Sequence, residues 1–167
     1  ITVALRLGAA VCLQHTCVCG APVDNTGRHG LSCRKSAGRL SRHSAVNELI
    51  KRALMSAGIP SRLEPTSLAQ HNDRRPDGMS LTPWTRGRCL ALDFTCPDTL
   101  APSHLNIAVN GPGVVANEAE MKKRAKYACL TSTFRFVPIA VETLGSLGDE
   151  ANNFIHDLGR RITTVTG

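Results

Sequence analysis

The stretch RPDGMSLTPWTRGRCLALDFTC, residues 75–96, decides the fold that the sequence predicts. Its second half reads as a β-strand, because apolar side chains take every second position from Leu90 to Phe94. Gly87, with the Pro83-Trp84 pair ahead of it, predicts a hairpin tip. The first half of the stretch should therefore form a strand that pairs with the second half.

Two aspartates of this hairpin are candidates for chemistry. Asp93 lies inside the apolar strand, where a carboxylate is unfavourable unless it is paired or binds a cation. Asp77 follows Pro76 at the edge of the neighbouring strand. Carboxylates on adjacent strands can share a hard cation such as Mg²⁺ or Mn²⁺, which polarises a phosphate and lowers the pKa of an attacking water. The pair predicts a metal-dependent site that hydrolyses phosphodiesters.

Helices and further strands are predicted on both sides of the hairpin. They are a helix from Ser41 ended by Gly58 and Pro60, an extended piece at 61–64, a helix at 114–130, a strand at 133–141 and a last helix at 147–162. On the first helix, the face expected to be buried consists of Val46, Leu49, Ile50, Ala53 and Ala57. This order predicts an α/β fold with a small mixed central sheet flanked by helices.

A short element rich in cysteine and histidine precedes this core. Cys17, Cys19, His29 and Cys33 offer the four thiolate and imidazole ligands that a structural zinc ion prefers. The first pair is spaced more tightly than usual, so Cys12 and His15 are alternative ligands. We therefore predict two parts: a zinc-binding element at 1–36, and a core at 37–167.

The composition favours a nucleic-acid partner. The formal charge is +7 and the pI about 9.4, and no acidic residue occurs from Asn25 to Asn47. The hydrophobic content of 42% is enough for a packed core, and no stretch approaches the roughly 20 apolar residues of a membrane span. Seven cysteines are an odd number without a secretory signal, which favours a reducing, intracellular compartment over a disulfide framework.

The helix predicted at 114–130 offers cations to the aspartate pair. Lys123 and Lys126 are three residues apart, and Tyr127 is four after Lys123, so the three share one helix face. A solvated basic helix, held by pairs of Glu118 with Lys122 and of Glu120 with Arg124, is the alternative reading of the same residues.

In this order, the motifs resemble those of a known family. They are the CCHC element of Cys17, Cys19, His29 and Cys33, then Arg42-His43 with Asn47, Glu64-Pro65, Arg75-Pro76-Asp77, Asp93 and Lys123-x-x-Lys126-Tyr127. The chain resembles the restriction-like endonuclease domain at the C-terminal end of site-specific non-LTR retrotransposon polyproteins, within the PD-(D/E)XK nuclease superfamily. The resemblance spans roughly residues 5–162. Together with the absence of an initial Met, it leads us to expect a segment of a longer polyprotein.

The resemblance implies a nuclear enzyme that nicks target DNA for integration, beside a reverse transcriptase domain of the same polyprotein and in contact with DNA and the element's RNA. Its catalytic set would be Asp77, Asp93, Lys123, Lys126 and Glu64, with structural Zn²⁺ and catalytic Mg²⁺ or Mn²⁺. Its nucleic-acid contacts would be Arg34, Lys35, Arg39, Arg42, His43, Lys122 and Tyr127.

The sequence departs from the wider superfamily at Thr95, where a lysine would stand two residues after Asp93. The lysine role would then pass to Lys123 or Lys126, and the residues do not decide between them. Glu48 should face solvent, because it lies almost opposite Ile50 on its helix. Glu64 is therefore the expected third acid.

Two other functions compete with the endonuclease. One is a catalytically inactive, zinc-assisted nucleic-acid-binding module of a retroelement protein. The other is an enzyme resembling Holliday-junction resolvases, which would prefer branched DNA.

Overall fold

The computed structural model describes residues 2–33, 35–68 and 75–167. Its N-terminal part holds α1 (Thr2–Leu7), the paired strands β1 (His15–Thr16) and β2 (Pro22–Val23), and the short helix α2 (His29–Ser32). The core contains α3 (Ala37–Ser56), β3 (Ser61–Leu63), β4 (Gly78–Thr85), β5 (Arg88–Thr95), α4 (Leu105–Ala108), α5 (Val114–Lys126), β6 (Arg135–Ala140) and α6 (Asp149–Thr166). Single 3₁₀ turns occur at Thr66–Leu68 and Ala128–Leu130.

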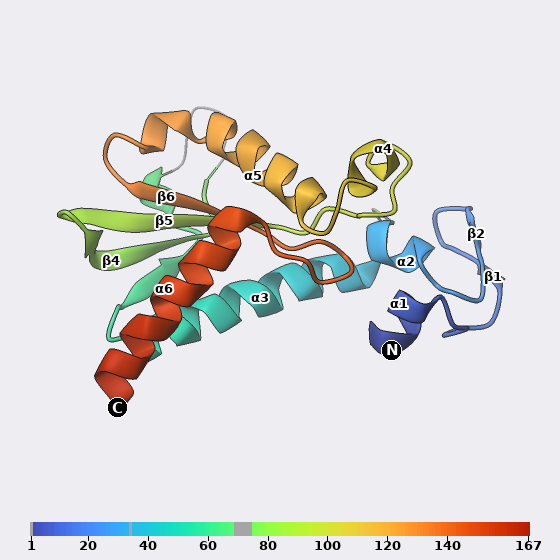
Figure 1. The fold of residues 1–167 in the computed structure, drawn as a ribbon, viewed down its shortest axis with the longest axis horizontal. Coiled ribbons are helices and arrows are strands. Elements are labelled where there is room, and N and C mark those ends of the chain that lie inside the picture. The colour runs from blue at the N-terminus through green and yellow to red at the C-terminus, as the bar shows by residue number, and fades with distance from the viewer. Residues whose placement is uncertain (1, 34, 69–74) are drawn as a thin grey trace.

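The core sheet has four strands in the order β3-β4-β5-β6. The first three are antiparallel neighbours, whereas β6 runs parallel to β5 after the crossover through α5. Figure 1 shows α5 on one side of the sheet and α3 and α6 on the other. The mixed central sheet flanked by helices, expected from the alternation around Asp93, is therefore confirmed.

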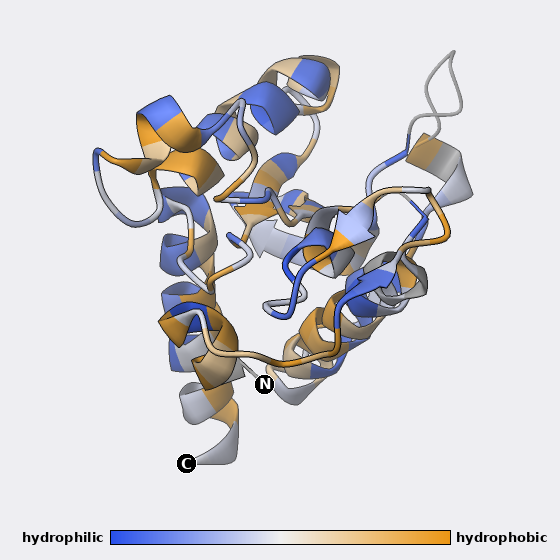
Figure 2. Ribbon diagram, turned by 90° about the vertical axis from the view of Figure 1, so that its right-hand side faces the viewer, coloured by the Kyte–Doolittle hydropathy of each residue, from blue (hydrophilic) through white to orange (hydrophobic). Residues whose placement is uncertain are grey.

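Strand alternation divides the core into two layers. Leu90, Leu92 and Phe94 of β5 are buried in the larger cluster, which includes Phe154 and Leu158 of α6. Their neighbour Ala91 belongs to the second cluster, with Tyr127 and Phe136. In Figure 2 the helices carry both hydrophilic and hydrophobic residues, as expected of helices that cover a sheet on one side only. Asp93 is buried and shares the side of Ala91, so α5 is the helix that covers it.

Several predicted boundaries and faces need correction. The first long helix begins at Ala37, four residues before Ser41, and Leu49 on it is 57% exposed while Leu54 is buried. Leu54 lies on the covered face because α6 as well as the sheet packs on α3. The hairpin forms as predicted, but Pro83 and Trp84 lie within β4 and only Arg86-Gly87 makes its tip. The helices α1, α2 and α4 and the short strands β1 and β2 were not predicted.

Two buried glutamates accept hydrogen bonds at the N-termini of α5 and α6. Glu142, just after β6, accepts hydrogen bonds from the backbone N–H groups of Val115 (3.1 Å) and Ala116 (3.3 Å), at the start of α5. Glu120 of α5 accepts from the backbone of Glu150 and Ala151 (both 2.9 Å), at the start of α6. Negative charge is favourable at helix N-termini, where backbone N–H groups lack partners.

The expected pair of Glu120 with Arg124 is therefore wrong. Glu120 is buried at the start of α6, and Arg124 instead donates to Glu150, with Nε 2.7 Å from Oε1. The expected pair of Glu118 with Lys122 is present at 2.7 Å. In the part of the chain that the structure describes, no helix is long and apolar enough to cross a membrane.

Candidate functional site

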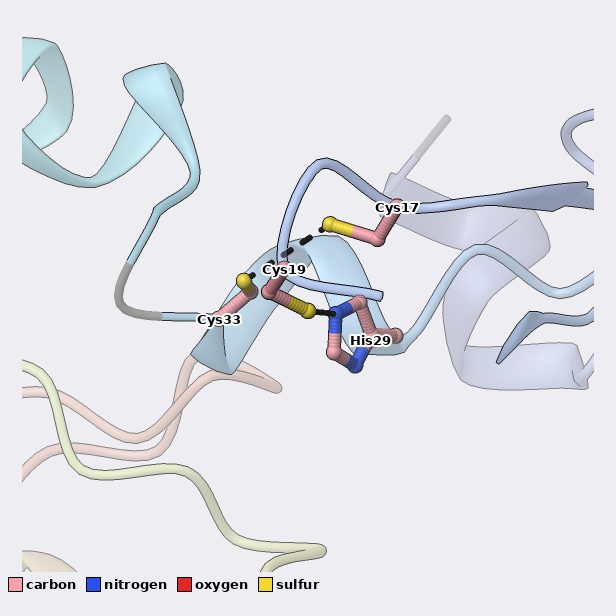
Figure 3. Close-up of side chains that lie close together, drawn as sticks. All are labelled: Cys17, Cys19, His29 and Cys33. Atoms are coloured by element: carbon pink, nitrogen blue, oxygen red, sulfur yellow. Dashed lines mark hydrogen bonds between the residues drawn. The ribbon is translucent and has the colours of Figure 1, made fainter. Parts of the chain in front are cut away.

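Four side chains of the N-terminal element converge on one point. Figure 3 shows Cys17 and Cys19 from the turn after β1, and His29 and Cys33 from either end of α2. All four ligand atoms lie within 4.8 Å of one another; Cys19 Sγ is 3.2 Å from His29 Nε2 and Cys17 Sγ is 3.8 Å from Cys33 Sγ. Three thiols and one imidazole are a ligand set that zinc binds tetrahedrally. The cluster predicted from the sequence could therefore hold zinc.

Local backbone geometry explains why the tight Cys17-x-Cys19 spacing is compatible with one ion. The Cys17 N–H donates to Ala21 O (2.9 Å) and the Gly20 N–H donates to Cys17 O (2.8 Å), which closes a tight turn. Gly20 adopts a positive φ of 91°, a conformation that side chains other than glycine rarely reach. The turn brings both thiols to the same side of the β1–β2 hairpin.

Electrostatics favours the thiolate form of Cys19. Its pKa is lowered to about 6, mainly by the backbone N–H of Ala21 and also by hydrogen bonds with Cys17, Cys33 and His29. The pKa of Cys17 is raised, because a hydrogen bond with the Cys19 backbone is outweighed by burial and by the neighbouring Cys19 and Cys33 thiols. Zinc is bound by the thiolate form. The alternative ligands are directed elsewhere, since Cys12 Sγ lies 3.3 Å from Asp24 O and His15 Nδ1 lies 2.9 Å from Leu13 O.

The second site lies between β4, β5, α3 and α5. Asp93 of β5 contacts Lys123 of α5, Nζ to Oδ2, and its side chain is 4% exposed. Asp77, one residue before β4, accepts a hydrogen bond of 2.6 Å from the Phe94 backbone N–H. Asp93 therefore lies in β5, and Asp77 lies at the start of the adjacent strand β4, as the hairpin predicted. Lys123 of α5 contacts Asp93.

Helix α3 adds two polar side chains to the same site. His43 Nε2 lies 3.2 Å from Asp77 Oδ2, and Asn47 Nδ2 lies 3.3 Å from His43 Nδ1. If the Asn47 amide donates to Nδ1, the neutral imidazole carries its proton on Nε2 and donates it to Asp77. Asn47 is buried, one helical turn from His43, so both residues face the aspartates.

The carboxylates at this site repel each other. Burial, and next the charge of Asp93, raise the pKa of Asp77, while Phe94 N–H, His43 and Lys123 oppose the shift. Burial disfavours the charged form, and a neighbouring carboxylate adds to that effect. A divalent cation beside both groups would stabilise their ionised forms, so the pair is electrostatically suited to one.

Three predicted site residues take other positions. Glu64 has a positive φ of 45° and its carboxylate is 2.6 Å from Arg75 Nη2, so the structure pairs it with Arg75 instead of joining it to the aspartates. Lys126 Nζ lies 2.8 Å from Tyr127 Oη and 4.4 Å from its ring centroid. The surface role expected for Tyr127 is wrong, because its side chain is fully buried against Phe136.

The remaining basic residues of the expected nucleic-acid surface have mixed placements. Lys35 is exposed, while Arg42 Nη2 donates to Leu31 O (3.1 Å) and so ties α3 to the end of α2. Lys122 is exposed and pairs with Glu118. Arg34 and the side chain of Arg39 lie outside the described residues.

Comparison of the sequence with protein-family models gives no match, and a search of curated proteins gives no significant match.

Proposed function

We propose that this chain is a Mg²⁺- or Mn²⁺-dependent DNA endonuclease domain of the restriction-like class, with a structural zinc element ahead of it. The observation that carries the proposal is Asp93, buried within an apolar strand, in contact with Lys123 and close enough to Asp77 to raise its pKa. The run from α3 to β6 supports the same class: it consists of a helix, three antiparallel strands, the helices α4 and α5, and a strand parallel to β5.

The donor chemistry of the pair suits a hard cation. Asp77 and Asp93 would hold Mg²⁺ or Mn²⁺, which prefer carboxylate oxygens. The bound cation would polarise the scissile phosphate and lower the pKa of the attacking water. Lys123, which contacts Asp93 and whose charge also acts on Asp77, would neutralise charge that develops on the phosphate. The interaction of His43 with Asp77, supported by Asn47, would keep that carboxylate oriented.

The zinc element and the basic surface extend the proposal to partners. Lys35, two residues after the zinc-cluster residue Cys33, and Lys122, next to Lys123 on α5, are exposed cations, and both suit phosphate contacts. With the motif order above, they support target-DNA nicking within a retrotransposon polyprotein. In that setting a reverse transcriptase domain, the element's RNA and a nuclear location would accompany this domain.

The proposal is tested by nicking of supercoiled plasmid. The zinc-loaded domain should convert supercoiled to open-circular DNA with added Mg²⁺ or Mn²⁺ and fail to do so without either ion. A double Asp77→Ala/Asp93→Ala variant should bind DNA but not nick it. Salt-sensitive DNA binding without nicking by the wild type would instead favour the inactive binding module. A strong preference for a four-way junction over linear duplex would favour the resolvase-like enzyme.

The two lysines of α5 should differ in their effect on nicking. Lys123→Met removes the cation beside Asp93, and we expect nicking to fall on the order of 100-fold, the typical cost of losing one group that stabilises the transition state. Lys126→Met should change nicking less than about tenfold, since the Lys126 ammonium group lies over the Tyr127 ring. Single-turnover nicking rates of both variants test this order.

A stability measurement separates catalysis from folding in this comparison. Removing Lys123 leaves the buried Asp93 carboxylate without its cation, which can destabilise by about 3–5 kcal/mol. The double variant Asp93→Asn/Lys123→Met should regain the thermal stability but not the nicking. Equal loss of nicking in Lys123→Met and Lys126→Met would contradict the assignment of Lys123.

A further inference from the structure

The end of the molecule farthest from the zinc element carries arginines that the proposed nuclease site does not use. In Figure 1 the tip of the β4–β5 hairpin lies at the left and the zinc element at the right. Beside this hairpin, a hollow is formed with β6 and α6. We call it the arginine hollow; its lining includes Trp84, Thr85, Arg135, Asn153, Arg160 and Arg161.

Arg161 is held in place within the arginine hollow. Its guanidinium carbon lies 3.8 Å from the centroid of the buried Trp84 ring, and its Nη2 donates to Trp84 O at 3.2 Å. Trp84 is itself packed against Phe154, with ring centroids 5.6 Å apart. An arginine fixed in this way loses less side-chain entropy when it binds an anion than a mobile one does.

The other two arginines are accessible. Arg135, the first residue of β6, is exposed, and it makes no ion pair with the part of the chain that the structure describes. Arg160 has 79% of its side chain exposed, and its Nη2 lies 3.8 Å from Asp157 Oδ1, beyond hydrogen-bond distance. Both guanidinium groups can therefore take a further anionic partner.

The acidic residues of the arginine hollow do not cancel this charge. Glu150 is already paired with Arg124. Asp157 is shared between Arg160 and Arg161, with 3.5 Å between its Oδ2 and Arg161 Nε. Arginine is the side chain best suited to phosphate, because its planar group donates two parallel hydrogen bonds. The excess of guanidinium groups therefore fits a phosphate-bearing partner.

The arginine hollow lies on the face of the sheet opposite Asp93, because its lining residue Val137 packs in the same cluster as Leu92. Its lining runs from Arg135, whose strand partner Leu90 is three residues from Asp93, to the hairpin tip. Strand β4 runs for 8 residues from Gly78, next to Asp77, to Thr85 at the hairpin tip. At 3.2–3.4 Å per residue this is roughly 25 Å. A phosphate bound at the hollow is thus not the one that contacts Asp77 and Asp93.

We propose that the arginine hollow is a second nucleic-acid surface, which binds backbone phosphates other than those at the aspartate pair. The inference extends the proposed function, but binding at this surface requires no catalysis. It can therefore fail or succeed independently of nicking.

The test is the salt dependence of nucleic-acid binding without Mg²⁺ or Mn²⁺. Fluorescence anisotropy with a labelled duplex and a labelled single strand, both of DNA, would compare wild type with Arg135→Gln, Arg160→Gln and the double variant. Arg52→Gln is the matched control, because Arg52 is an exposed arginine of α3. Arg161 is left intact because its stacking on Trp84 contributes to packing.

Loss of two phosphate contacts should flatten the slope of log affinity against log salt by about 1.8 for the duplex or about 1.4 for the single strand. Between 50 and 200 mM salt, the wild type should then lose roughly 12-fold more duplex affinity than the double variant. Each single variant should give about half the change in slope, and Arg52→Gln almost none. The probe with the larger change identifies the form of nucleic acid that the hollow binds.

Either of two outcomes would overturn the inference. In one, the double variant keeps the wild-type slope on both probes, or each single variant changes it no more than Arg52→Gln does. In the other, a poly-glutamate peptide of equal charge displaces the probe from the wild type as well as unlabelled DNA does, which would indicate an acidic protein partner. Nicking by the double variant is recorded separately and bears only on the aspartate pair.

Discussion

Asp93→Asn should abolish nicking while leaving the domain folded. The change removes one negative charge and keeps the shape of the side chain, so the buried packing around Asp93, whose side chain is 4% exposed, is preserved. The cation would lose one of its two carboxylates. Because metal assistance amounts to several kcal/mol of transition-state stabilisation, we expect a loss on the order of 1000-fold or more. Gel quantification of open-circular plasmid under single-turnover conditions measures it.

Asp98→Asn is the matched control for this variant. Asp98 lies in the loop after β5, five residues beyond Asp93, and its Oδ1 accepts a hydrogen bond from the Leu100 backbone N–H. We expect near wild-type nicking from it. The binding of uncut DNA should be unchanged or slightly stronger in Asp93→Asn, because a negative charge near the phosphate is gone. Wild-type nicking by Asp93→Asn would refute the proposed site.

The second large effect concerns zinc. The purified domain should contain one equivalent of zinc, and Cys33→Ser should contain less than about a tenth of that, because three protein ligands no longer close the site. Cys33 is buried between the turn of Cys17 and α2, so its loss should also expose the N-terminal element to protease. Elemental analysis and limited proteolysis measure the two effects.

The control for the zinc prediction is Cys12→Ser. The Cys12 thiol is directed to Asp24 O, so zinc content should stay near one equivalent. Zinc affinity should also weaken as the pH falls, because protons compete with the ion for the thiolate and imidazole ligands, and Cys19 joins this competition below about 6, the value to which its pKa is lowered. Zinc retained in Cys33→Ser, or lost in Cys12→Ser, would contradict the ligand set.

Removal of zinc should disturb the structure of the nuclease site only in part. Arg42 donates to Leu31 O and lies one residue before His43, which contacts Asp77. Loosening of α2 would therefore disturb the start of α3. The sheet that carries the two aspartates should stay folded, because its hydrophobic clusters include no residue of the zinc cluster. Among the described residues, this hydrogen bond is one physical link between the two sites.

The fold was predictable from local patterns. Alternation along β5, the glycine at the hairpin tip and the helical spacing on α6 each depend on a few consecutive residues, and the side-chain period of a strand or helix does not depend on the rest of the chain. Boundaries were less predictable, as the early start of α3 at Ala37 shows.

The sequence by itself determined the four candidate zinc ligands and the placement of Asp77 and Asp93 on neighbouring strands. Both follow from short-range geometry. A turn joins Cys17 to Cys19, one helical turn joins His29 to Cys33, and the β4–β5 hairpin joins Asp77 to Asp93. Only the tertiary structure decided that Lys123 contacts Asp93, that Glu64 pairs with Arg75 and that Tyr127 is buried. The way in which α5 packs on the sheet places Lys123 beside Asp93 and buries Tyr127. The periodicity of a short stretch of sequence does not predict how segments distant in the chain pack on one another.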